Sequence, residues 1–134
     1  MGALKTILCL GLLVASAALP ARALPQIASD RALLFAACAG RYSATMEHAW
    51  LMGQDGAEAR DRRAVFVDQL EALQPQAVAQ GLSGPALLHA RIAAKAAQAR
   101  LLHLASFHTE PDRQRRAHAA ARRAMAPCAA LLLA

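Results

Sequence analysis

The chain has two pairs of residues whose types and spacing suit metal or haem chemistry. His48 and Met52 lie four residues apart, so on a helix they share one face. An imidazole nitrogen and a thioether sulfur are ligands that suit copper, whose reduced form favours soft donors. Met46 and His118 form the second pair, which could hold a haem iron between two helices. Two ligands do not make a site, however, and methionines at helical spacing usually pack in a core.

The amino-terminal residues have the features of a secretory signal peptide. Lys5 precedes an apolar run from Ile7 to Leu19, and small residues occupy the positions that a cleavage site after Ala23 requires. Ala17 offers a second cleavage site. The run is shorter than the roughly 20 residues that span a bilayer. We expect residues 1–23 to be removed on export to the periplasm or medium, leaving no transmembrane segment; a retained anchor is the alternative.

Removal of the leader leaves two cysteines in an oxidising compartment. Cys9 lies within the leader, so Cys38 and Cys128 remain. A single intramolecular disulfide is the leading interpretation. It would close a loop of about 90 residues, worth roughly 4 to 5 kcal/mol in the chain-entropy model. Two unrelated buried thiols are the alternative.

The composition of residues 24–134 predicts one all-helical domain. Thirty of these 111 residues are alanine, the best helix former, whereas isoleucine, valine and threonine together supply seven. Glycine and proline clusters divide the domain into four helices, at about 30–52, 56–74, 84–108 and 110–133.

Several helix ends carry recognisable signals. Ser29 or Asp30 is expected to cap the first helix. Asp55 and Glu58 resemble a capping box for the second helix, which should end near Pro75. In the fourth helix, an internal proline at position 127 removes one backbone hydrogen bond and predicts a kink rather than an end.

Short connections favour an up-down four-helix bundle with antiparallel neighbours. In that topology the first helix begins where the fourth ends, so Cys38 and Cys128 lie at one end of the bundle. The disulfide would then join the first helix to the fourth.

Helical wheels predict one apolar stripe on each helix. The stripe of the first helix is centred on Cys38 and includes Phe35, Tyr42 and Met46. The second helix contributes Phe66, Leu70 and Leu73. The stripe of the third helix comprises Leu88, Ile92, Ala96, Ala99 and Leu102.

Motifs for enzymatic chemistry are missing from the sequence. It has no Gly-x-Ser-x-Gly, no glycine-rich phosphate loop, no Cys-x-x-Cys and no histidine pair at the spacing of a zinc helix. We therefore expect no enzymatic activity, no catalytic residue and no resident cofactor. The metal or haem pairs remain an alternative.

Charge is distributed unevenly along the chain. Residues 24–80 hold five basic and seven acidic groups, whereas residues 81–134 hold eight basic and two acidic ones. The excess is concentrated on the fourth helix, where four arginines lie opposite the apolar stripe: Arg115, Arg116, Arg122 and Arg123. This arginine face could attract an anionic surface or an acidic protein, and nucleic acid is not expected as a partner outside the cytoplasm. The alternative is a solvated face that keeps the protein soluble.

Three parts of the sequence resemble small exported helical proteins of alphaproteobacteria that carry no assigned function. They are residues 37–51, the segment Ile92-Ala-Ala-Lys-Ala-Ala, and a late Cys128 before Leu131. The resemblance implies export and a cysteine pair between the first and last helices. It transfers no active site.

The leading hypothesis is a non-enzymatic exported helical module that binds an unknown partner. The partner would bind through the arginine face or through the surface from Tyr42 to Met52, which includes Trp50.

Overall fold

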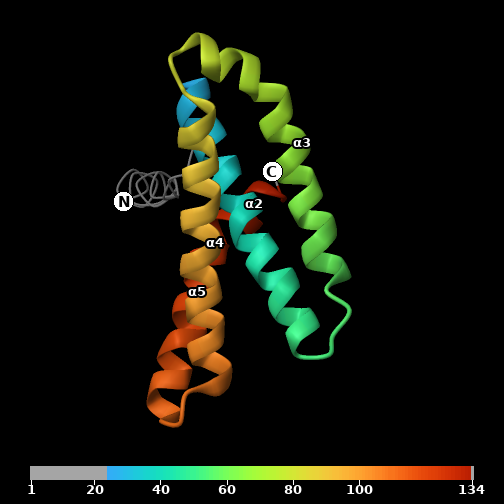
Figure 1. The fold of residues 1–134 in the computed structure, drawn as a ribbon, viewed down its shortest axis with the longest axis vertical. Coiled ribbons are helices and arrows are strands. Elements are labelled where there is room, and N and C mark those ends of the chain that lie inside the picture. The colour runs from blue at the N-terminus through green and yellow to red at the C-terminus, as the bar shows by residue number, and fades with distance from the viewer. Residues whose placement is uncertain (1–23, 134) are drawn as a thin grey trace, which may run out of the picture.

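The computed structural model describes residues 24–133, which form four helices with no strand (Figure 1). The helices are α2 (Ala28–Leu51), α3 (Ala57–Ala79), α4 (Gly84–Phe107) and α5 (Pro111–Leu131). The predicted all-helical class and the order of four helices are confirmed. The predicted signal peptide at residues 1–23 lies outside the described residues.

The four helices alternate in direction along the chain, as predicted (Figure 1), and two of them, α3 and α4, pack on α2. α2 packs extensively on both α3 and α4, whereas α5 packs mainly on α4. α2 and α4 run parallel, because Gly40 lies against Arg91 and, farther along both helices, His48 contacts Ser106. Parallel directions for α2 and α4 agree with the predicted alternation, but the prediction did not include their extensive contact, in which a helix packs on the next but one in the chain.

Small side chains explain the close approach of α2 and α4. Every fourth residue from Ala28 to Ala44 is alanine or glycine, and all of them are buried. At Gly40, an added Cβ would lie 2.2 Å from the carbonyl oxygen of Arg91. Residues four apart share one helix face, so this row lets the two backbones meet.

The opposite side of α2 forms an aromatic core with α3. The ring of Phe66 lies 5.9 Å from that of Phe35 and is stacked on that of Tyr42 at 5.8 Å. Leu70 and Leu73 pack against the same cluster. The predicted stripes of the first two helices are confirmed at these residues.

The disulfide between Cys38 and Cys128 is present and joins α2 to the end of α5. The Cα atoms of the two cysteines are 5.6 Å apart, and both residues are fully buried. Three residues earlier in α5, the sulfur of Met125 accepts a hydrogen bond from the hydroxyl of Thr45. The carboxyl-terminal end of α5 turns toward α3 (Figure 1), and the helix continues through Pro127 as predicted.

Three predicted helix ends are wrong. The capping box of Asp55 and Glu58 does not form, because Gly56, which has no side chain, is the N-cap of α3. α3 continues through Pro75 to Ala79; the proline is exposed, so its ring avoids a neighbouring helix although one backbone bond is lost. α2 begins at Ala28, and neither Ser29 nor Asp30 caps it. Instead, the backbone N–H of Ser29 donates to the side-chain oxygen of Gln80 at 3.0 Å and ties α2 to the end of α3.

Among residues 24–133, no helix is both long and apolar enough to cross a membrane.

Candidate binding groove between α2 and α4

The apolar stripe predicted for the third helix is largely exposed in the structure. Leu88 is 57% and Ile92 56% exposed, and Ala96 and Ala99 are exposed as well. α4 instead buries Leu87 against α2 and α3, and Gln98 beside α5. The prediction that this stripe forms a core seam is therefore wrong, because α4 packs through a neighbouring face.

Two hollows lie beside this stripe, between α2 and α4. The first has a volume of about 340 Å³ and is lined by Ser43, Met46, Glu47, Arg63, Leu88, Arg91, Ile92 and Lys95. The second has a volume of about 530 Å³ and is lined by Ala44, Glu47, His48, Leu51, Ala99, Arg100, His103 and Leu104. Both volumes are of the size that pockets for small molecules or anchoring side chains have.

Glu47 lines both hollows, and we call the two hollows together the α2–α4 groove. Lys95 donates to a carboxylate oxygen of Glu47 at 2.6 Å and bridges the groove between the hollows. Both side chains are more than a third exposed, so this ion pair adds at most about 1 kcal/mol of stability. The ion pair therefore fixes the position of the Lys95 side chain and contributes little to the stability of the fold.

The walls of the groove combine apolar surface with uncompensated positive charge. Arg91 and Arg100 form no ion pair within residues 24–133. Arg63 reaches in from α3, where its Nε donates to the hydroxyl of Ser43 at 2.9 Å. The only carboxylate that lines the groove is that of Glu47, which Lys95 already engages.

His48 and His103 lie at the carboxyl-terminal end of the groove. The Nε2 atom of His48 is 3.0 Å from the hydroxyl of Ser106, and the rings of His48 and His103 both lie near that of Phe107. This hydrogen bond holds α2 and α4 together where they diverge. The alternative copper pair of His48 and Met52 lies at this end of α2, and residues 24–133 contain no group of three or more histidine, cysteine or acidic side chains that could hold a metal.

Met46 and His118, the alternative haem pair, line different hollows. Met46 packs against the aromatic core and the first hollow of the groove. His118 lies on α5, beside Ala105 of α4. The structure therefore does not bring the two side chains to a common site.

Tyr42 and Trp50 differ in their availability to a partner. Tyr42 is 3% exposed and stacked on Phe66, so it does not contribute to an accessible surface; this corrects its predicted role in partner binding. Trp50 is half exposed, and its indole N–H donates to the carbonyl oxygen of Asp55 at 2.9 Å. That bond fixes the turn between α2 and α3.

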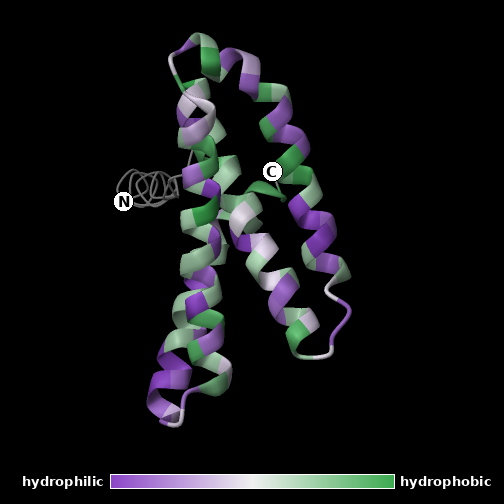
Figure 2. Ribbon diagram, viewed as in Figure 1, coloured by the Kyte–Doolittle hydropathy of each residue, from purple (hydrophilic) through white to green (hydrophobic). Residues whose placement is uncertain are grey.

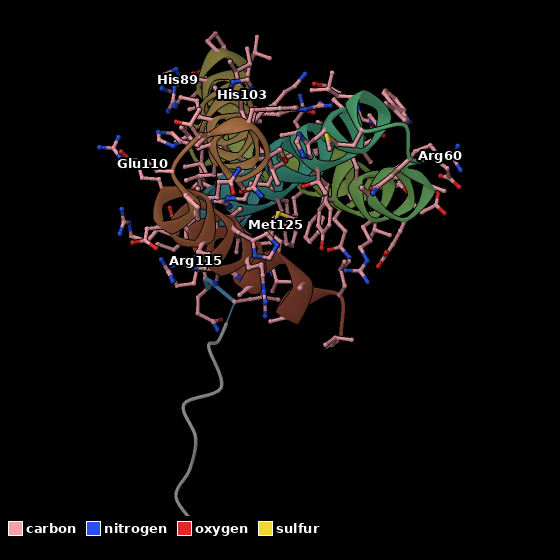
Figure 3. The ribbon with its side chains drawn as sticks, turned by 90° about the horizontal axis from the view of Figure 1, so that it is seen from below. Arg60, His89, His103, Glu110, Arg115 and Met125 are labelled. Atoms are coloured by element: carbon pink, nitrogen blue, oxygen red, sulfur yellow. A yellow bond between two sulfur atoms is a disulfide. The ribbon has the colours of Figure 1, made fainter. Side chains whose placement is uncertain are left out.

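The arginine face lies on the outer side of α5. Arg115, Arg116, Arg122 and Arg123 are exposed, and Arg115 lies at the periphery in Figure 3, with Met125 in the interior. Arg115 pairs with Asp112, and the neighbouring Arg113 pairs with Glu110. Much of the first half of α5 has the colour of hydrophilic residues in Figure 2. A hollow beside α5 is lined by Arg115 and not by the other three predicted arginines.

One arginine on α3 has a perturbed pKa. The side chain of Arg62 lies beside the phenol of Tyr42, and interaction with this group raises the pKa of the guanidinium above its ordinary value; Glu58, 2.5 Å away, adds to the shift. Arg62 therefore stays charged and covers the edge of the aromatic core.

Sequence reasoning missed the groove, although a signal of it is present in the sequence. Arg91, Lys95 and Arg100 flank the apolar stripe of α4. Basic residues along a stripe that is supposed to be buried indicate that one edge of it faces solvent or a partner.

Comparison with protein-family models, with curated proteins and with solved structures finds no match to this chain.

Proposed function

We propose that this protein is an exported, non-enzymatic helical binding module whose binding site is the α2–α4 groove. The observation that carries the proposal is the exposed apolar stripe of α4, which lies beside two hollows with a combined basic rim. Single exposed apolar residues are common on proteins. A row of them at helical spacing beside a groove is a feature of interaction sites.

The groove supports this function better than the arginine face does. The hollow at the arginine face is lined by one of its four arginines, Arg115, and the charge of Arg115 is offset by its ion pair with Asp112. The groove offers apolar contact area and charge in the same place, and both are needed for a specific interface.

Binding rather than catalysis agrees with the state of the cysteines. Cys38 and Cys128 are joined and fully buried, so neither provides a thiolate nucleophile. The disulfide also agrees with export to an oxidising compartment. Mass spectrometry of the exported protein should find an amino terminus at Leu24.

Photo-cross-linking in the exporting cell tests where a partner binds. The photoreactive residue p-benzoylphenylalanine is placed at Ile92 in the groove, at Arg122 on the arginine face, or at Val78 on the outer surface of α3. We expect an adduct from position 92 and none from position 78. An adduct from position 122 alone would show that the partner binds at the arginine face and not in the groove.

A further inference from the structure

We propose that the α2–α4 groove receives an amphipathic helix of a partner protein, and that acidic residues flank the apolar face of that helix. This inference rests on the proposed function, because it names the kind of partner that binds at the same site.

The length and spacing of the groove suit a helix. The stripe runs from Leu88 to Leu102, about 21 Å at 1.5 Å per residue. The first hollow lies beside Ile92 and the second beside Ala99, seven residues or about 10.5 Å farther along α4. A helix bound along the groove would present side chains at i and i+7 with this same spacing, and such anchors are typical of helices bound in grooves.

Residues 24–133 leave much of the surface of the stripe unburied. Leu88 and Ile92 are more than half exposed, and Phe107, near the end of the same helix, is 48% exposed. α3 leaves them exposed, since it packs mainly on α2 and meets α4 at Leu87, on a different face of that helix. A bound helix would bury this surface as a fourth helix does in a bundle.

The charges around the groove specify the flanks of the bound helix. Arg63 and Arg91 border the first hollow and Arg100 borders the second. The carboxylate of Glu47 is already paired with Lys95. A partner with glutamate or aspartate beside its apolar face would pair with these three guanidinium groups, and complementary charge also increases the rate and specificity of association.

The same charges argue against a second copy of this chain as the occupant. In a symmetric dimer, the same surface of each copy faces its counterpart. Arg91 and Arg100 would then face the same arginines of the other copy, with Glu47 as the only carboxylate of the groove to offset them. Like charges in an interface cost binding free energy.

Two synthetic peptides of 18 residues test the inference. Both are helical with leucines at i, i+3 and i+7; one carries glutamates beside the leucines and the other carries lysines at the same positions. Each is labelled with fluorescein, and binding to the purified, oxidised protein is followed by fluorescence anisotropy. We expect the acidic peptide to bind at least about tenfold more tightly than the basic one, with the difference reduced at high salt.

Variants with matched controls locate the binding site. Ile92→Asp should weaken binding of the acidic peptide by about tenfold or more, whereas Val78→Asp, at a similarly exposed valine of α3, should leave it unchanged. Arg91→Glu combined with Arg100→Glu should reverse the preference between the peptides. Arg122→Glu combined with Arg123→Glu makes the same change of charge on α5 and should not reverse it. Circular dichroism confirms that each variant is folded.

Three results would overturn the inference. The first is equal affinity for the two peptides, or an effect of the control variants as large as that of the groove variants. The second is a dimer in analytical ultracentrifugation that Ile92→Asp dissociates, which would assign the groove to a second copy. The third is the absence of peptide binding while cross-links still form at position 92. In that case the proposed function stands, but the partner does not bind as an amphipathic helix. Loss of both peptide binding and cross-linking would contradict both proposals.

Discussion

Gln98 is a large polar side chain buried at the packing surface of α4 and α5. It is 2% exposed, its Nε2 donates to the carbonyl oxygen of Ala121 at a long 3.4 Å, and its Oε1 has no partner within residues 24–133. A buried polar atom without a hydrogen bond costs about 1 to 3 kcal/mol. This residue therefore weakens the interface that holds α5.

Gln98→Met should stabilise the protein by about 1 kcal/mol, because it removes the unpaired oxygen while nearly conserving volume. Equilibrium urea unfolding of the oxidised protein measures the change. Gln74→Met, at an exposed glutamine of α3, is the control and should change the free energy of unfolding by less than about 0.5 kcal/mol. Destabilisation by Gln98→Met would mean that the amide is hydrogen-bonded in solution.

At the level of the helices, the contact between α2 and α4 depends on the lack of a side chain at Gly40. The carbonyl oxygen of Arg91 occupies the space that a Cβ would need. Because α4 supplies one wall of the groove, the same contact sets the position of Arg91 and Lys95 relative to α2.

Gly40→Ala should destabilise the protein by about 1 to 3 kcal/mol, since overpacking forces the two backbones apart. Gly84→Ala is the matched control, because nothing lies within 4 Å of a Cβ at that position. The control should be neutral or slightly stabilising. Thermal unfolding compares the two variants, and equal midpoints would show that α2 and α4 are farther apart than described.

Pro75 lies inside α3 and is exposed. Its ring removes the hydrogen bond to the carbonyl of Glu71 and costs helix stability. Pro75→Ala should therefore stabilise the protein by about 1 kcal/mol or more, after allowance for the greater freedom of the unfolded chain. Urea unfolding measures it, and hydrogen exchange of residues 71–79 should slow. A loss of stability would indicate that α3 ends before the proline in solution.

For the molecule as a whole, the disulfide determines how firmly the last helix is attached. α5 packs mainly on α4 and touches α2 at few positions outside the bridge. The bridge closes a loop with a sequence separation of 90 residues, so it restricts the unfolded chain strongly.

Reduction should lower the free energy of unfolding by about 2 to 5 kcal/mol. The measurement is urea unfolding with and without reductant. In the Cys38→Ala, Cys128→Ala double variant, reductant should have no effect, which separates the loss of the bridge from other actions of the reagent. Equal stability of the native protein in both conditions would contradict the structural role of the bridge.

Much of this fold follows from the sequence. High alanine content and few β-branched residues determine that the domain is helical, and glycine and proline clusters delimit four helices close to those observed. The pairing of Cys38 with Cys128 follows from cysteine number and the expected compartment. Each of these conclusions depends on local conformational preference or on counting residues. None of them requires knowledge of which helix lies beside which.

Only the tertiary structure decided which helix faces meet. The wheel of α4 offers two usable faces, one with Leu88 and Ile92 and one with Leu87 and Gln98, and local pattern does not choose between them. The choice depends on the close approach at Gly40, which selects the second face and leaves the first exposed. Alanine-rich helices differ little in apolarity around their circumference, so backbone proximity rather than hydrophobic periodicity determined the packing, and with it the groove.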